Sequence, residues 1–411
     1  MVTVGIHHFL FRSCYQQGRN EKNSPCCVTL LQSDRNHIYS LTHQQIHTLC
    51  ALSGEMSEDM KKVDLFISSQ SHQSLREGAL DLLKHVREEW KKDEVKFKIF
   101  TDGITNHLLG CYLEDQPDDI VLVRVYGQKT ELFIDRGAEV KNMHLVYKAG
   151  FGSPLYCAFT NGLCYGYQPG VTLDAKLVTD PFVSSCVAQL MARMHNIRQM
   201  TVNGVGPHPS LFRVIRRFLE LVPDSFEDKE KDKRLKVYLP SKEVLKTEIN
   251  KLEIHLSQLG SPVVFCHNDL LLKNIIFNKE KGTVAFVDYE YADYNYQAFD
   301  IGNHFCEFAG VDTFVPENYP DRSFQIQWLQ KYLEASYALK YKDRREITND
   351  EVEVLYIQVN KFALASHLMW GIWSLVQSAH SCLDFDFLGY AKERLDQYFA
   401  RKDEFFALKF P

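Results

Sequence analysis

The most informative part of the sequence is Cys266-His267-Asn268-Asp269-Leu270-Leu271-Leu272-Lys273-Asn274, together with Val287-Asp288-Tyr289-Glu290-Tyr291 further along the chain. Between these segments lie two apolar runs, at residues 275–277 and 284–287, which are joined by a polar turn at residues 278–282. Short apolar runs on either side of a turn that contains a glycine predict a β-hairpin. Asp269 therefore precedes the hairpin, Asn274 opens it and Asp288 closes it.

An Asp, an Asn and a second Asp in this order indicate a site for phosphoryl transfer like that of the protein kinases. In such a site one Asp accepts the proton of the attacking hydroxyl, and the Asn and the other Asp hold Mg²⁺. The alternative is ordinary turn chemistry, because Asp and Asn are common in loops for structural reasons. The spacing around the hairpin favours the site, so we predict Asp269 as the catalytic base and Asn274 and Asp288 as metal ligands.

The composition is that of an ordinary globular protein, with 45% hydrophobic and 24% charged residues in a chain of 411, a length that suits two lobes. A net charge of −6 and the lack of a basic stripe argue against nucleic-acid binding. Eleven scattered cysteines and a polar N-terminus without a secretory signal predict a cytoplasmic location. Residues 362–383 carry no charged side chain, but several polar residues interrupt them, so we predict a buried helix and no membrane insertion.

The pattern along the chain divides it into three parts. Residues 1–73 are polar and lack a sustained period, which predicts a variable, poorly ordered extension. Residues 74–168 read as a strand-rich, ATP-binding lobe, with a helix from Leu75 to Trp90, another at residues 135–148, and strands at 95–100, 107–113, 120–127, 155–159 and 163–167. A hinge at residues 164–170 leads to the catalytic and substrate-binding lobe, residues 169–411, with helices at 184–195, 242–259, 321–341, 349–380 and 387–399. The expected fold is α+β and bilobal, with a small antiparallel-sheet lobe and a larger, mainly helical lobe, as in protein kinases.

Two features of the first lobe are candidates for ATP binding. The turn Asp102-Gly103-Ile104-Thr105-Asn106 lies between two predicted strands, where backbone N–H groups could cover phosphates, although an ordinary hairpin turn would look the same. Arg124 lies in the middle of a strand, where a charge needs a partner, and Glu139 on the following helix is the best one. In kinases such a pair contacts the α- and β-phosphates; the alternative is an Arg on an exposed edge strand.

Acids and aromatic residues in the second lobe predict a receptor for an organic cation. Asp300, Glu307, Trp370 and Trp373 are the candidates for substrate binding, through ion pairing and cation–π contact. A purely structural aromatic core is the alternative for the two tryptophans. His267, two residues before Asp269, is expected to brace the loop rather than to transfer a proton.

Over residues 75–411 the chain resembles the choline/ethanolamine kinases, within the aminoglycoside-phosphotransferase-like kinases. The resemblance rests on Phe265-Cys266-His267-Asn268-Asp269, Asp288-Tyr289-Glu290-Tyr291, Asn295-Tyr296 and Asp300-Ile301-Gly302-Asn303-His304-Phe305. The segments Lys273-Asn274-Ile275-Ile276 and Glu307-Phe308-Ala309-Gly310-Val311 resemble the ethanolamine branch more than the choline branch.

The resemblance implies ATP and Mg²⁺ as cofactors and ethanolamine as a small-molecule substrate, in the CDP-ethanolamine route to phosphatidylethanolamine, carried out by a monomer or homodimer. A choline kinase, a dual-specificity kinase and a non-catalytic pseudokinase scaffold are the alternatives. Gly166 departs from the family pattern, which has Glu there, and is expected to loosen the hinge and weaken contacts to adenine.

Overall fold

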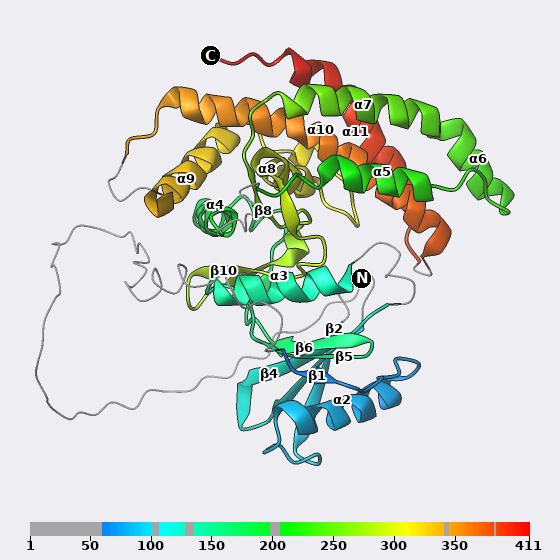
Figure 1. Ribbon diagram of the computed structural model, residues 1–411, viewed down its shortest axis with the longest axis vertical. Helices are drawn as coiled ribbons and strands as arrows, with labels where there is room; N and C mark the ends of the chain where they lie inside the picture. The colour runs from blue at the N-terminus through cyan, green and yellow to red at the C-terminus, as the bar shows by residue number, and fades with distance from the viewer. Residues whose placement is uncertain (1–59, 101–106, 128–134, 198–205, 341–344, 382–383) are drawn as a thin grey trace, which may run out of the picture.

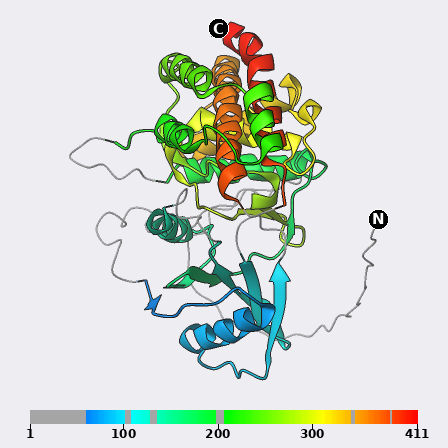
Figure 2. The same cartoon turned by 90° about the vertical axis from the view of Figure 1, so that its right-hand side faces the viewer.

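The computed structural model describes residues 60–100, 107–127, 135–197, 206–340, 345–381 and 384–411. These residues form two lobes, a sheet with the helix α2 in one and a cluster of helices in the other (Figure 1). A view turned by 90° shows the same separation, with α3 between the lobes (Figure 2). The turn Asp102–Asn106 lies outside the described residues.

The N-terminal lobe is built on a six-stranded sheet with strand order β1-β5-β6-β4-β3-β2. Its strands are β1 (Lys62–Val63), β2 (Val95–Phe100), β3 (His107–Leu113), β4 (Gln116–Val125), β5 (Leu155–Phe159) and β6 (Gly162–Gly166). All neighbouring pairs are antiparallel except β1 with β5. The five strands predicted from alternating apolar residues are therefore present, with shifts of a few residues at their ends.

Two parts of this lobe correct the sequence analysis. The first helix, α2 (His72–Val86), ends before Trp90, which is buried in the same core from outside the helix. The end of the segment predicted to be a poorly ordered extension also packs on this lobe. Lys62 and Val63 pair with β5, and Ile67 is only 1% exposed. A strand of two residues has too short a pattern to be recognised in the sequence.

Gly166, at the hinge, lies at the end of β6 with its backbone paired. Its N–H donates to Pro154 O at 2.9 Å, and the next N–H, of Tyr167, donates to Ile120 O at 3.0 Å. A Cβ at Gly166 would come within 2.8 Å of the Pro154 ring. Gly166 therefore allows the Pro154 ring to lie close to the backbone of β6. The two backbone hydrogen bonds hold this part of the hinge in place.

The C-terminal lobe is mainly helical. Its helices are α4 (Pro181–His195), α5 (Leu211–Leu221), α6 (Lys229–Tyr238), α7 (Lys242–Ser257), α8 (Gln297–Cys306), α9 (Arg322–Lys340), α10 (Asn349–His380) and α11 (Phe387–Ala407). As predicted, α10 is a buried helix: it is covered by its neighbours over most of its middle, and no helix in the described ranges is long and apolar enough to cross a membrane. The helices α5, α6 and α8 were not predicted.

The predicted hairpin is present as β9 (Ile275–Asn278) and β10 (Thr283–Phe286), which pair from Ile275 with Phe286 to Asn278 with Thr283. On its other side β9 pairs with β7 (Val171–Thr172), just past the hinge. A second small sheet joins β8 (Val263–Cys266) to β11 (Asp293–Tyr296). These two sheets hold the Asp269 loop between them. The helix α3 (Arg136–Lys148) adds its buried Met143 and Val146 to the main core, which links the two lobes.

Candidate active site

The backbone is strained at two positions of the site. Among the described residues other than glycine, only Asn268 and Asp288 have a positive φ, of 65° and 66°. Left-handed backbone is costly for a residue with a side chain and persists where the surroundings enforce it. Asn268 Nδ2 donates to Tyr291 O at 2.9 Å, which ties the first segment of the site to the second. The surrounding structure therefore holds Asn268 and Asp288, one on each side of the hairpin, in this backbone conformation.

Asp300, on the first turn of α8, holds the Asp269 loop by hydrogen bonds to the loop backbone. Asp300 Oδ1 accepts the N–H of Asn268 at 2.7 Å, and Oδ2 accepts the N–H of His267 at 2.9 Å. His195 Nε2 lies 2.9 Å from Oδ2 as well. Burial works to raise the pKa of Asp300, but the hydrogen bonds and charge of its partners, led by His195, outweigh it and hold the pKa below its ordinary value.

These contacts correct the prediction that Asp300 binds the substrate. The side chain is completely buried, and both of its oxygens are taken by the loop and by α4. Its residue type fits either role, and only the three-dimensional structure shows that the loop lies above it. His267 does brace the loop as predicted, since its Nε2 lies 3.0 Å from Val287 O at the end of the hairpin.

Asp269 lies at the head of the loop with a partly exposed side chain. Asn274 Nδ2 donates to Asp269 O at 2.8 Å and approaches Asp269 Oδ2 at 3.4 Å, so the hairpin strand that follows holds the loop in place. Burial and the nearby carboxylates of Glu307, Asp288 and Glu290 raise the pKa of Asp269 well above its ordinary value. A carboxylate of raised pKa is a better proton acceptor than an ordinary one.

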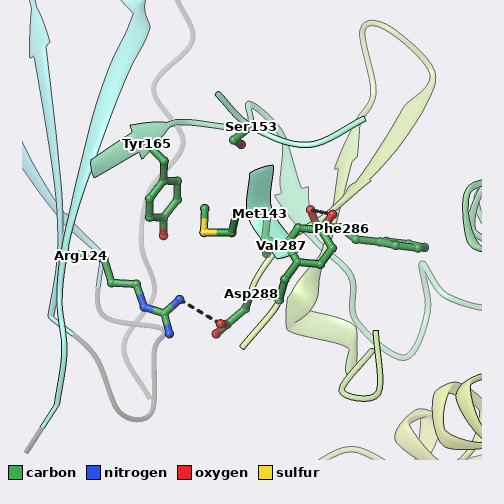
Figure 3. Close-up of a pocket in the computed structure, with 8 residues that line it drawn as sticks. Arg124, Met143, Ser153, Tyr165, Phe286, Val287 and Asp288 are labelled. Carbon is green, nitrogen blue, oxygen red and sulfur yellow. Dashed lines mark hydrogen bonds and ion pairs between the residues drawn. The ribbon is translucent and has the colours of Figure 1, made fainter. Parts of the chain in front are cut away.

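Arg124, from the sheet, and Asp288, at the end of the hairpin, contact each other beside a pocket that both residues line (Figure 3). Arg124 is 5% exposed and makes the predicted ion pair with Glu139, with Nη1 to Oε1 at 2.9 Å. It also contacts Asp288 Oδ1 at 3.0 Å and Glu290 Oε2 at 2.5 Å. The pocket is lined by Arg124, Met143, Ser153, Tyr165, Phe286, Val287, Asp288 and Tyr289. One guanidinium thus gathers three carboxylates where the sheet meets the hairpin.

A second group of residues consists of aromatic side chains on α10 and after the hairpin, and the other predicted substrate residue, Glu307, follows α8 and is buried. Trp370 and Trp373 lie on α10 with their rings 5.5 Å apart, and Tyr291 packs edge-on against Trp370 at 5.3 Å. Both indole N–H groups are used, since Trp373 Nε1 donates to the Tyr291 hydroxyl at 2.9 Å and Trp370 Nε1 donates to Asn303 Oδ1 at 2.8 Å. These bonds fix the rings in place, and aromatic faces of this kind attract organic cations.

Five residues of the site were not predicted from the sequence: Asn268, Glu290, Tyr291, Asn303 and Arg394. The first four lie within three residues of predicted site residues in the same short motifs, so their position in these motifs could have indicated that they belong to the site. Arg394, on α11, had none, because a single Arg on an amphipathic helix reads as a solvated residue. In the structure it is fully buried and bound to Glu307.

Comparison with known proteins assigns this arrangement to a family. The choline/ethanolamine kinase family model matches residues 97–399, which include both halves of the site. The chain belongs to the choline/ethanolamine kinase family. Human ethanolamine kinase 1 is 47% identical over 359 residues, which are 86% of this chain and 78% of the human protein. Mouse ethanolamine kinase 2 is 49% identical, over 81% of this chain and 83% of the mouse protein.

Among solved structures, a Plasmodium vivax ethanolamine kinase superposes with a TM-score of 0.70 at 27% identity, over 81% of this chain and 90% of the other. A Cryptosporidium parvum choline kinase superposes with a TM-score of 0.65 at 23% identity, over 80% and 96%, which shows a common fold. The resemblance inferred from the motifs and the bilobal, kinase-like α+β fold are thus confirmed. The assignment to the choline/ethanolamine kinase family also makes the chain a member of a family of enzymes.

Proposed function

We propose that this family member transfers the γ-phosphoryl group of ATP to the hydroxyl of ethanolamine and so makes phosphoethanolamine, a precursor of phosphatidylethanolamine through CDP-ethanolamine. The observation that carries the proposal is that the aromatic group lies against the Asp269 loop, because Tyr291 O accepts a hydrogen bond from Asn268 Nδ2 and the Tyr291 ring packs on Trp370, so a base and a cation receptor share one site. A small amino alcohol joins a hydroxyl to an ammonium over two carbons and suits both groups at once. The similarity to ethanolamine kinases of human and mouse supports this substrate.

The residues predicted to hold Mg²⁺ fit that ion. Asp288 offers a carboxylate that is 33% exposed, and Asn274 offers a carboxamide oxygen that accepts no hydrogen bond from the described residues. Hard oxygen ligands of this kind are those that Mg²⁺ prefers. When bound, Mg²⁺ neutralises the charge of the β- and γ-phosphate oxygens.

The remaining roles follow from the geometry of the side chains. Arg124, held by Glu139, would present its guanidinium to the phosphates in place of its contacts to Asp288 and Glu290. Asp269 would accept the hydroxyl proton as that oxygen attacks phosphorus. The turn Asp102-Gly103-Ile104-Thr105-Asn106 is proposed to cover the phosphates from the sheet side.

Glu307 and its aromatic neighbours are proposed to bind the ammonium end of the substrate. A primary ammonium keeps three N–H donors, so it gains more from a carboxylate than a methylated ammonium does. Glu307 supplies that carboxylate, and Tyr291, Trp370 and Trp373 supply the aromatic rings. Choline, which carries the same charge but has no N–H to donate to a carboxylate, is the second candidate, because the rings would also receive it.

The free thiols of the described cysteines support a reducing, cytoplasmic setting for the reaction.

The direct test is ADP release by the full chain with ATP and Mg²⁺, in parallel with ethanolamine, with choline and without an amine. We expect a higher kcat/KM for ethanolamine than for choline and little release without an amine. Faster turnover of choline would assign the other substrate, and release that no amine stimulates would refute the proposal.

A further inference from the structure

Arg394 is a buried cation that the roles described above do not use. It lies on α11, far along the chain from the Asp269 loop, and its side chain is fully buried. A buried charge is costly unless it is paired and hydrogen-bonded. The guanidinium donates from Nη1 to Glu307 Oε1 at 2.7 Å and to the Tyr390 hydroxyl at 2.9 Å, and from Nη2 to Ser366 Oγ at 2.8 Å. These bonds place its charge beside Glu307, the carboxylate proposed to bind the amine.

The first branch of these contacts leads to the carboxylate proposed to bind the amine. Arg394 donates to Glu307 Oε1, and the Glu307 carboxylate makes no other hydrogen bond to the described residues. The carboxylate is therefore held by one oxygen while Oε2 stays available to an incoming ammonium. Glu307 is 4% exposed, and a carboxylate buried to this degree needs a paired cation to offset the cost of burying its charge.

The second branch leads to the catalytic loop, and its direction is determined by the chemistry of Arg394. A guanidinium can only donate, so Ser366 Oγ must accept from it and send its own proton elsewhere. That proton goes to Asn303 Oδ1 at 2.7 Å, which also accepts the N–H of Trp370. Asn303 Nδ2 is thereby turned to the loop, where it donates to Asn268 O at 3.3 Å, one residue before Asp269.

We propose that Arg394 is a positioning residue for the reaction, which holds Glu307 for the amine and, through Ser366 and Asn303, orients the loop that carries Asp269. The inference rests on the proposed function and deepens it, because it assigns substrate affinity to one branch and the rate of the chemical step to the other. A residue that touches neither substrate nor phosphate would thus set both properties of the amine site and leave the ATP site unchanged.

The test separates the branches by kinetics on the purified full chain. Arg394→Met should raise the KM for ethanolamine at least tenfold and lower kcat, with the KM for ATP within twofold of the unchanged chain. In Arg394→Lys the ammonium can still pair with Glu307 but cannot donate to Ser366 at the same time. The KM for ethanolamine should therefore stay near normal while kcat falls. Ser366→Ala cuts only the second branch and should lower kcat without raising either KM.

A double-mutant cycle and a matched control complete the experiment. Because Arg394 acts on the amine through Glu307, the loss in kcat/KM of the Arg394→Met/Glu307→Gln pair should be less than the product of the single losses. Arg401→Met serves as the control, since Arg401 lies on the same helix but packs on Tyr319 and Phe405. It should leave both KM values within twofold.

Three results would overturn the proposal: equal rises in the KM for ethanolamine and for ATP, independent losses in the cycle, or normal kinetics of a folded Arg394→Met chain. If Arg394→Met does not fold, Arg394→Lys and Ser366→Ala decide, and normal kcat in both would reject the second branch. Failure of the proposed function gives a different pattern, since the unchanged chain would then show no ethanolamine-dependent ADP release.

Discussion

The exchange Asp300→Asn tests the brace beneath the catalytic loop, because it keeps the shape of the side chain and alters one atom. Wherever the new NH₂ group is placed, one loop N–H loses its acceptor. At the position of Oδ1 it would face the N–H of Asn268, and at the position of Oδ2 it would face that of His267. His195 can adapt by changing its tautomer, but the backbone amides cannot.

The magnitude follows from these contacts. A buried N–H left without a partner costs about 1–3 kcal/mol, and the loss of charge on the remaining bond adds roughly 1 kcal/mol. We therefore expect the free energy of unfolding to fall by about 2–4 kcal/mol. Because the loop carries Asp269, a shift of its backbone by a fraction of an ångström to 1 Å should lower kcat by up to about a hundredfold.

The assay combines urea unfolding with steady-state kinetics, and Asp174→Asn is the matched control. Asp174 also accepts two backbone N–H groups, of Lys176 at 3.0 Å and Leu177 at 2.7 Å, but both reach the same oxygen in an exposed turn. An amide oxygen can keep both bonds, so the control should lose less than about 1 kcal/mol. Equal stability and kcat in the Asp300→Asn and unchanged chains would refute the reasoning.

Further predictions concern the base, a buried histidine and a close helix contact. Asp269→Asn should lower kcat by several orders of magnitude while ATP still binds in a titration; near-normal turnover would remove Asp269 from the mechanism. Burial lowers the pKa of His304 to about 4, below its ordinary value of 6.5, so its contribution to stability is present above pH 6.5 and is lost as the pH falls towards 4. About 3 kcal/mol of unfolding free energy should go with it, and His304→Asn should flatten this dependence in urea unfolding at pH 7 and 4.5. Gly302→Ala should cost about 1–3 kcal/mol, because the new Cβ would lie 2.7 Å from Val359 O on α10; an unchanged unfolding midpoint would contradict this.

The parts of the fold that local pattern determines could be predicted. The hairpin and the strands of the N-terminal lobe follow from short alternating or apolar runs, and α10 from a long apolar stretch with polar interruptions. The helix α8 was missed because all ten of its residues are buried, including Asp300, Asn303 and His304, so it has no solvated face to give a period. The strand β1 was missed because two residues carry no period at all.

The candidate site was predictable where one motif holds the residues and unpredictable where tertiary contacts decide their roles. Asp269, Asn274 and Asp288 lie next to one hairpin, and Arg124 lies on the strand that precedes the helix of its partner Glu139, so the sequence could pair them. Asp300 was given the wrong role because burial under the loop is not visible in sequence. Arg394 was missed because its partner Glu307 lies 87 positions away in the chain.

The identity of the reaction product tests the proposed function of this protein most directly. The full chain with ATP, Mg²⁺ and ethanolamine should form one phosphoethanolamine for each ADP, with the phosphoryl group on oxygen as seen by ³¹P NMR, and Asp269→Asn should form almost none. Release of ADP with inorganic phosphate in place of phosphoethanolamine, or undiminished product from Asp269→Asn, would contradict the account.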